Sequence, residues 1–491
     1  MYRQLFILFI FCLGAVGAAA RSLPMSLDEA IALARVRSVD AAEALDELRT
    51  AYWEWRSYRA DQLPELRFEA TLPRYSKQYS AYMNELGNYS FVANNFLEAQ
   101  GTLSLTQNVR LTGGTVSLST SLDYLRQFGS NASNRFMSIP IALTINQPIF
   151  GTNHMRWNSR IEPVRYSEAK AAFLSATEDV SRLAVQYYFS LLLSCENLAI
   201  AEQNLANAEK LYTVAQEKRK MGQISENDLL QMELNLLDAR SDHTDCLSSQ
   251  KADMFNLRSF LDLEQDVEIV PQIPDSVPQV TISFNDALDR ALANNKFAKN
   301  MMRRQLEADY EVARAKGNLR QISLVAQIGY SGTDTEFNDA YRRLRSNQVA
   351  SIGVSIPLLD WGKRRGQVKV AESNRRVTES RLRREAMNFN QELFILIERF
   401  CNQQSQLSIA TRASEIALKR YDTNVQTYMI GRISTLDLND SQTKKDTALR
   451  QYVNELYLFW SYWYQIRSLT LYDYLNHGDI NADIERIIRM E

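Results

Sequence analysis

Residues 221–228 read MGQISEND and residues 430–437 read IGRISTLD, so one pattern of glycine, serine and aspartate occurs twice in the chain. The offset of 209 residues between these two stretches also separates Pro148 from Pro357, which lie in two similar motifs. A constant offset over a long span is the signature of an internal repeat. The sequence therefore predicts two copies of one structural unit, with equal helix lengths after the proline.

The two copies also begin alike, because SLDEAI at residues 26–31 resembles SFNDAL at residues 283–288, at an offset of 257. The first copy must then carry 48 extra residues before Pro148. They fall in the region of residues 74–136, which is rich in Tyr, Asn, Ser and Gly and is expected to form strands and loops. This insertion adds either a hairpin or only a longer surface loop.

Alternating apolar and polar residues predict β-strands before each pair of helices. The apolar members of the three clearest runs are Val116, Leu118 and Leu122, then Ile139, Ile141, Leu143 and Ile145, then Ile352, Val354 and Ile356. Such strands build a sheet with one face on a protein core, or an outer-membrane barrel whose apolar face meets lipid. The pattern leaves both alternatives open.

Residues 157–221 and 362–430 are rich in helix formers, and each stretch is expected to form one unbroken helix of about 100 Å. Apolar residues recur every seven positions, for example Leu191, Leu198 and Leu205, as in coiled-coil seams. Small residues form a second seam that lets neighbouring helices approach closely. An isolated fibrous coiled coil is the alternative, but it leaves the strands unexplained.

The repeated Gly-x-x-Ser-x-x-Asp pattern predicts a tight turn between two antiparallel helices. Glycine takes the left-handed conformation that ends a helix, and Ser-x-x-Asp forms a capping box at the start of the next one. Gly222, Ser225 and Asp228 would make the first turn, and Gly431, Ser434 and Asp437 the second.

Asp440 follows Asp437 on the same helix face, and no capping rule requires a carboxylate there. Around a symmetry axis, Asp437 and Asp440 would form acidic rings at the narrow end of a channel. Alternatively, both carboxylates complement the dipole at a solvated helix start. The repeat architecture favours the rings.

Composition excludes several other functions. The 491 residues contain 56 Lys plus Arg and 58 Asp plus Glu, a balance that does not favour a nucleic-acid partner. With three histidines and no nucleotide-binding loop, zinc-binding pair or catalytic triad, the sequence predicts neither an enzyme nor a cofactor or metal site. Cys195, Cys246 and Cys401 do not form a disulfide framework.

The first 20 residues combine Arg3, an apolar run and Ala18-Ala19-Ala20, which is typical of a cleaved secretory signal peptide. No later stretch reaches about 18 consecutive apolar residues, so any later membrane span must be a β-barrel. We expect a signal peptide at 1–20, a first repeat at 21–270, a proline-rich linker at 271–280, a second repeat at 281–475 and a tail at 476–491.

Taken together and in order, these motifs resemble the TolC-like outer-membrane efflux protein family over nearly the whole mature chain. The resemblance rests on both helix turns, on the paired openings at Leu27 and Phe284, and on two strand-ending motifs, QPIF at 147–150 and IPLLDWG at 356–362. It implies a mainly α fold with a transmembrane β-barrel, in which three chains share one β-barrel and one periplasmic α-barrel.

The resemblance also implies a passive exit duct of a tripartite efflux or type I secretion system. Its partners would be a periplasmic adaptor, an inner-membrane pump of RND or ABC type and outer-membrane lipid. Asp437, Asp440 and Tyr428 match gate positions of the family, whereas Gly222, Ser225, Asp228, Gly431, Arg432 and Ser434 would belong to adaptor-facing turns. Ile433 stands where some members carry a gate arginine. The alternatives are a periplasmic or surface coiled-coil scaffold and an enzyme.

Overall fold

The computed structural model describes residues 21–83, 87, 89–129, 132–264, 266–274, 277–319, 321–355, 359–429, 432–433, 435–482 and 484–488. The expected signal peptide, residues 1–20, lies outside the described residues. The chain forms two compact units, and both predicted repeats contribute to each. We call them the sheet unit, drawn from Arg49–Ala169 and Lys299–Ala386, and the helical unit, drawn from Met1–Leu48, Lys170–Ala298 and Met387–Glu491.

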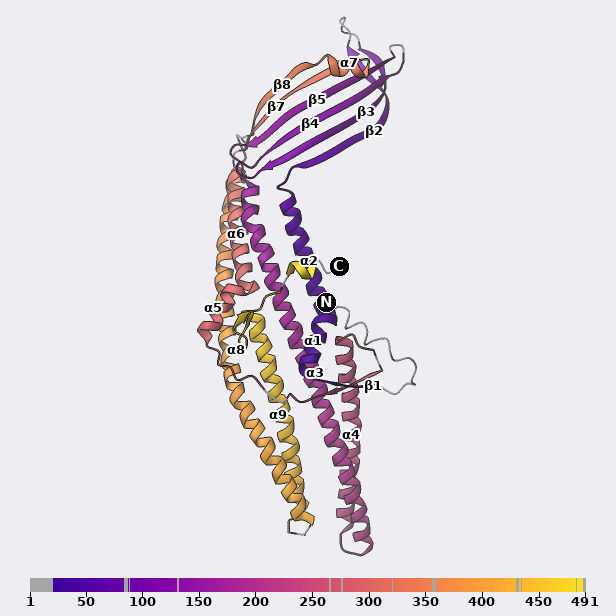
Figure 1. Ribbon diagram of the computed structural model, residues 1–491, viewed down its shortest axis with the longest axis vertical. Helices are drawn as coiled ribbons and strands as arrows, with labels where there is room; N and C mark the ends of the chain where they lie inside the picture. Colours follow the sequence, from indigo (N-terminus) through magenta and orange to yellow (C-terminus); the bar gives the residue numbers. More distant parts are fainter. Residues whose placement is uncertain are drawn as a thin grey trace, which may run out of the picture. The chain divides into compact units, whose positions relative to one another are not determined.

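The sheet unit contains one antiparallel sheet of six strands in the order β2-β3-β4-β5-β7-β8, and Figure 1 shows them side by side in a curved layer. The bounds are β2 Glu65–Met83, β3 Tyr89–Val109, β4 Gly114–Gln127, β5 Ser133–Pro148, β7 Gln321–Asp334 and β8 Arg345–Ser355. A short helix, α7 (Phe337–Arg342), joins β7 to β8. Ser138 on β5 donates a buried 2.6 Å hydrogen bond to the carbonyl of Ala340 and so ties α7 to the sheet.

The predicted alternation is confirmed for the described residues, and the pairing register carries one apolar row across five of the six strands; Ile356 lies outside the described residues. Leu66 lies opposite Leu105, which lies opposite Leu118, and the same face continues through Leu143 to Ile328. These five side chains are between 37% and 66% exposed. A sheet whose apolar face packs on a core would bury them, so their exposure favours the alternative in which this face meets lipid.

The first long helix is α3 (His154–Lys220), which continues through Pro163. The expectation of an unbroken helical stretch overlooked this proline. Pro163 has no N–H to donate to the carbonyl of Ser159, so one helical hydrogen bond is missing there. The second long helix is α8 (Lys363–Met429). At their starts, α3 and α8 belong to the sheet unit together with α6 (Lys296–Gly317), and Glu168 of α3 binds Arg303 of α6 at 2.6 Å.

The helical unit is built around two helix pairs, α3 with α4 and α8 with α9. The second members of these pairs are α4 (Glu226–Phe260) and α9 (Thr435–Thr470). The unit also contains β1 Arg21–Met25, α1 Leu27–Arg37, β6 Val267–Pro271, α5 Phe284–Asn294, β9 Tyr472–Asp473, β10 Gly478–Asp479 and α10 Ile484–Ile488. Helix α2 (Val39–Ala60) begins in this unit and continues into the sheet unit from Arg49. Strand β1 pairs with β6 in parallel. The core collects Val180 to Leu192 of α3 with aromatic side chains of α8 and α9, including Phe400, Phe459 and Trp463.

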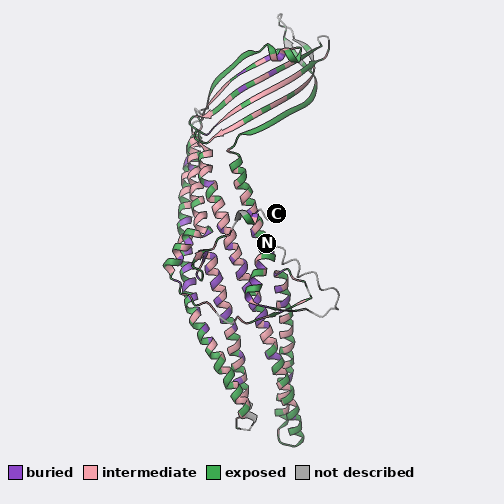
Figure 2. Ribbon diagram, in the orientation of Figure 1, coloured by how far each residue is buried: buried purple, intermediate pink, exposed green. Residues whose placement is uncertain are grey.

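By length and composition alone, α3 is apolar enough to cross a membrane, but 44% of its most apolar 18-residue window is buried within the protein. Because this part of α3 supplies the core of the helical unit, packing accounts for its hydropathy. Figure 2 shows the buried positions along the middle of the helices and the exposed ones around the first helix turn.

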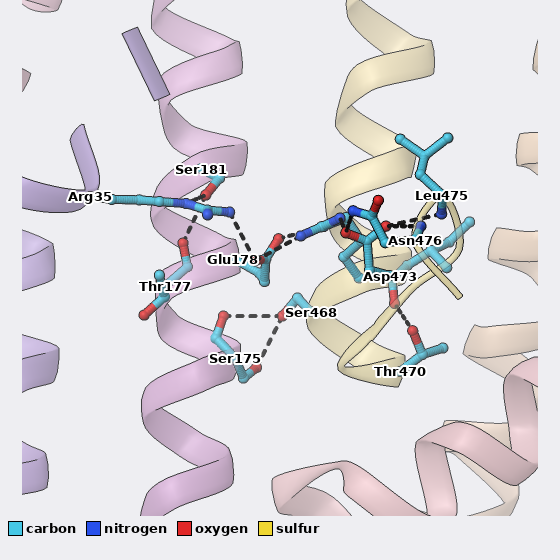
Figure 3. Close-up of polar contacts among 12 residues, drawn as sticks. Arg35, Ser175, Thr177, Glu178, Ser181, Ser468, Thr470, Asp473, Leu475 and Asn476 are labelled. Carbon is cyan, nitrogen blue, oxygen red and sulfur yellow. Dashed lines mark hydrogen bonds and ion pairs between the residues drawn. The ribbon is translucent and has the colours of Figure 1, made fainter. Parts of the chain in front are cut away.

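Glu178 on α3 is the centre of a charged network inside the helical unit, shown in Figure 3. Its carboxylate is 1% exposed and accepts from Arg35 of α1 at 2.8 Å and from Arg467 of α9 at 2.9 Å. Arg467 also reaches Asp473 at 3.1 Å, and Arg35 donates to the hydroxyl of Ser181 at 2.7 Å. One buried acid therefore links the start of the first copy to the end of the second.

Tyr188 of α3 links the two chain segments that form the small parallel sheet. Its hydroxyl accepts from the Gln272 N–H at 2.8 Å and lies 2.6 Å from the Gln272 carbonyl and 2.9 Å from the Met25 carbonyl, either of which can accept its proton. Burial raises the pKa of Tyr188 to about 12.

We expect Tyr188→Phe to lower the free energy of unfolding by about 0.5–1.5 kcal/mol, because the hydrogen bonds of its hydroxyl to the backbone of Met25 and Gln272 are lost while the Gln272 N–H keeps the Met25 carbonyl at 3.1 Å. Urea unfolding at neutral pH measures the change. Tyr212→Phe, a change on a less buried turn of the same helix, is the matched control. Equal free energies of unfolding for the Tyr188→Phe and Tyr212→Phe proteins would show that the Tyr188 hydroxyl does not stabilise the fold.

Candidate functional site: the two helix turns

The turn between α3 and α4 has the geometry that its sequence predicts. Gly222 has a φ of +70°, the left-handed conformation that glycine adopts without strain. Ser225 caps α4: its hydroxyl accepts from the Asp228 N–H at 3.1 Å, and the Asp228 carboxylate accepts from the Ser225 N–H at 3.1 Å. These hydrogen bonds to Ser225 lower the pKa of Asp228. The capping box predicted for this turn is confirmed.

The first turn presents charges to solvent rather than a pocket. Residues 216–223 are all exposed, and Lys220 pairs with Glu217 at 2.7 Å on the outside of α3. Arg219 reaches across the turn to Glu226 at 3.7 Å and donates to the carbonyl of Ile224 at 3.4 Å. The first turn is therefore both capped and solvated.

The turn between α8 and α9 is described only in part. Gly431 and Ser434 lie outside the described residues, and Tyr428 lies in α8 with a side chain that is likewise not described. Arg432 is exposed, and its backbone N–H donates to the carbonyl of Thr427 at 3.1 Å. The second capping box therefore stays a prediction.

The structure places Asp437 and Asp440 together on the first turns of α9, and both are exposed. Asp440 forms an ion pair with Arg420 of α8, 2.7 Å from nitrogen to oxygen, with each side chain 49% exposed. The carbonyl of Asp437 accepts from the side chain of Asn424 on α8 at 3.4 Å. Both aspartates thus lie where α9 contacts α8, and Arg420 compensates the charge of Asp440.

Arg420 is the residue that the sequence reasoning missed. It lies 20 positions before Asp440, and only the antiparallel packing of α8 on α9 brings the two together. Next to it, the ammonium group of Lys445 lies 4.5 Å from the centre of the Tyr421 ring. The Gly431 turn could have suggested such cross-helix contacts, because antiparallel packing brings the residues before a tight turn close to those after it.

Further from the turns, polar contacts attach α9 to α3. Arg450 donates to the side-chain oxygen of Asn197 at 2.7 Å, and Gln442 is hydrogen-bonded to Asn204. Gln403 of α8 also donates to the carbonyl of Glu455 on α9 at 3.0 Å. The second helix pair is therefore held by an exposed ion pair near its turn and by several hydrogen bonds behind it.

The comparisons with known proteins support the fold. The profile described as outer membrane efflux protein matches residues 30–261 and 287–476. The structure resembles the CmeC outer membrane channel of Campylobacter jejuni, with a TM-score of 0.67 and 15% identity over 94% of this chain and 88% of that one. It also resembles the outer membrane protein VceC of Vibrio cholerae, with a TM-score of 0.60 and 14% identity over 93% and 97% of the two chains.

A third solved structure, the MtrE outer membrane channel of Neisseria gonorrhoeae in its open state, has a TM-score of 0.58 and 12% identity over 96% of this chain and 95% of that one. No curated protein sequence matches the chain at a significant level. The family profile covers both copies, and the likeness in fold spans the sheet and the helices alike. The chain belongs to the outer membrane efflux protein family.

Proposed function

We propose that three copies of this outer-membrane efflux protein form the exit duct of a tripartite efflux or type I secretion system. The observation that carries the proposal is the sheet: its exposed face is apolar from Leu66 to Ile328, and its other face carries residues such as Ser104, Ser119 and Thr144. In a barrel the first face contacts lipid and the second lines an aqueous lumen. Conduction is passive and involves no catalysis.

The same sheet distinguishes the duct from a coiled-coil scaffold. A scaffold in water would expose Leu66, Phe68, Ile328 and Ile352, each more than half exposed, with no compensating contact in the part of the sheet that the structure describes. Lipid removes this cost. Density-gradient fractionation of cell envelopes should place the protein in the outer membrane, extractable only with detergent, and cross-linking should give a trimer. A soluble monomer in the periplasmic fraction would favour the scaffold.

The two helix turns provide the proposed contact to the periplasmic adaptor, and through it to an inner-membrane pump of RND or ABC type. The first turn supports this role because Gly222, Ser225 and Asp228 form a rigid cap among exposed charges. Gly431, Arg432 and Ser434 would be the equivalent positions of the second turn.

The proposed constriction is formed by Asp437 and Asp440, repeated three times around the axis, and Tyr428 is the third proposed gate residue. Its support is the exposure of both aspartates at the start of α9. Carboxylate rings attract cations and repel anions within a Debye length of about 8 Å at physiological salt.

We expect Asp437→Asn combined with Asp440→Asn to leave the trimer intact and to reduce the preference for cations over anions. Reversal potentials in planar bilayers under a salt gradient measure this preference. Asp422→Asn, an exposed acid on α8, is the control for a general loss of surface charge. A properly assembled trimer with unchanged conductance and selectivity would contradict the acidic constriction.

A further inference from the structure

The six strands do not divide equally between the two copies, and the repeat offsets identify the additional ones. At the offset of 257, β7 (Gln321–Asp334) corresponds to the first part of β2. At the offset of 209, β8 (Arg345–Ser355) corresponds to the second part of β5. No counterpart in the second copy remains for β3 and β4. The 48 extra residues of the first copy therefore form a β-hairpin inserted between two strands that the repeat alone would pair directly.

The inserted hairpin is part of the sheet and keeps its two faces. Leu105 of β3 lies directly opposite Leu118 of β4 on the apolar face, and their side chains are 40% and 41% exposed. On the polar face, Ser104 lies opposite Ser119. An accessory loop packed on the outside of a barrel would need neither the continuous register nor this alternation.

The inserted strands are also long enough to cross the membrane. β3 has 21 residues and β4 has 14, whereas a tilted transmembrane strand needs about 9–11. β4 pairs with β5 from Thr115 to Gln127, so the insertion is joined to the duplicated strands along their length. The β3–β4 hairpin therefore has the strand register, the alternation of apolar and polar side chains and the strand length that a transmembrane barrel requires.

We infer that three copies of this chain close an eighteen-stranded barrel, in which the β3–β4 hairpin of each copy is part of the wall. The inference rests on the proposed trimeric channel. Among the described strands, β2 and β8 are the two edges of the sheet, and their free N–H and C=O groups must be paired within lipid. The occupant of each edge is a second copy: β2 of one chain pairs with β8 of the next.

The insertion then sets the width of the outer-membrane exit. With strands about 4.8 Å apart and tilted by about 40°, eighteen strands enclose a backbone diameter of about 36 Å, compared with about 24 Å for twelve. Barrels of this size leave an aqueous channel rather than a packed interior. The barrel of this protein would accordingly pass bulky cargo freely and leave selection to the helix turns.

Disulfide trapping between edge strands tests the strand number. One cysteine replaces Arg67 on β2, and the second is placed in turn at the polar-face positions of β8, in a protein whose free Cys195, Cys246 and Cys401 have been changed to serine. The scanned positions of β8 are Asn347, Val349, Ser351 and Gly353. The matched control places the first cysteine at Ser119 of β4, which lies in the same row as Arg67 because Ser104 is opposite both.

We expect oxidation in isolated outer membranes to link the Arg67→Cys protein into covalent trimers for at least one β8 position, and the Ser119→Cys protein for none. In an eighteen-stranded wall, β4 is three strand spacings, about 14 Å, from the neighbouring β8, whereas a disulfide needs Cβ atoms about 4 Å apart.

Cross-links from Ser119 but not Arg67 would overturn the inference, because β2 and β3 would then lie outside the wall. A twelve-stranded wall that leaves the β3–β4 hairpin outside would instead pair β2 directly with β5. A second set of proteins therefore carries Arg67→Cys together with a cysteine at Ala142, Thr144 or Asn146 of β5, and a disulfide within one chain at any of these positions would also overturn the inference. Native trimers that cross-link from neither position would also overturn it, because the edges would not meet. A protein that does not fractionate as an outer-membrane trimer would instead contradict the proposed function itself.

Discussion

Replacing Glu178 by alanine should lower the free energy of unfolding of the helical unit by about 3–5 kcal/mol, because it leaves two guanidinium groups without their buried partner. Glu178 is 1% exposed and accepts from both Arg35 and Arg467. Arg467 keeps one other acid, Asp473, at 3.1 Å. Arg35 keeps only its hydrogen bond to Ser181 among the contacts described for it. The loss should therefore separate α1 from α3 and α9.

Urea unfolding of the detergent-solubilised protein, followed by circular dichroism, measures this effect. The matched control is Glu217→Ala, which removes an exposed ion pair with Lys220 on the same helix and should change the unfolding free energy by about 1 kcal/mol or less. Glu178→Gln should lie between the two, because the amide can still accept one hydrogen bond. Equal stabilities of the Glu178→Ala and Glu217→Ala proteins would show that the network does not hold the unit together.

The second large effect is expected at Arg420, whose guanidinium compensates the charge of Asp440 at 2.7 Å. Arg420→Ala should raise the preference for cations about two- to eightfold. Three uncompensated carboxylates, each about 10 Å from the permeating ion, together contribute about 1 kcal/mol in water before salt screening. The change should cost little stability, because the ion pair is half exposed.

A double-mutant cycle separates the charge of Arg420 from its packing. Asp440→Asn alone should lower the cation preference, and Arg420→Ala combined with Asp440→Asn should restore a value near that of the unmodified protein. Arg412→Ala, which breaks a similar exposed pair with Glu415 on α8, is the control and should leave selectivity unchanged. The substitutions at Arg420 and Asp440 must change the cation preference in opposite directions. Changes in the same direction would show that loosening of the turn, rather than charge, determines the cation preference.

The features that sequence reasoning predicts well are those that repeat. Gly222 and Ser225 could be assigned to a capped turn because local rules for glycine and serine fix the backbone there, and the structure confirms both. The alternation around Leu118 and Leu143 likewise predicts strands, since side chains point to opposite faces of a sheet. It could not show which environment covers the apolar face, because that depends on the exposure of the folded sheet.

The features that the sequence does not predict depend on contacts between distant parts of the chain. Glu178 has no recognisable motif, and its two arginines lie 143 residues before it and 289 residues after it. Arg420 and Asp440 meet only after α8 packs on α9. Pro163 was overlooked because helix-forming residues surround it, and the helix continues through it. The repeat offset located the insertion before Pro148 but could not distinguish a hairpin from a loop, because loops and strand ends share Tyr, Asn, Ser and Gly.

The proposed channel is a trimer of this chain that conducts ions through a constriction of acidic residues. Its most direct test is single-channel recording in planar bilayers, with subunits counted by cross-linking in the same preparation and Arg420→Ala recorded beside the unmodified protein. We predict small, cation-selective currents from a trimer, with stronger cation preference in the variant. A trimer for which neither protein conducts, or for which both conduct without preferring cations, would contradict the account.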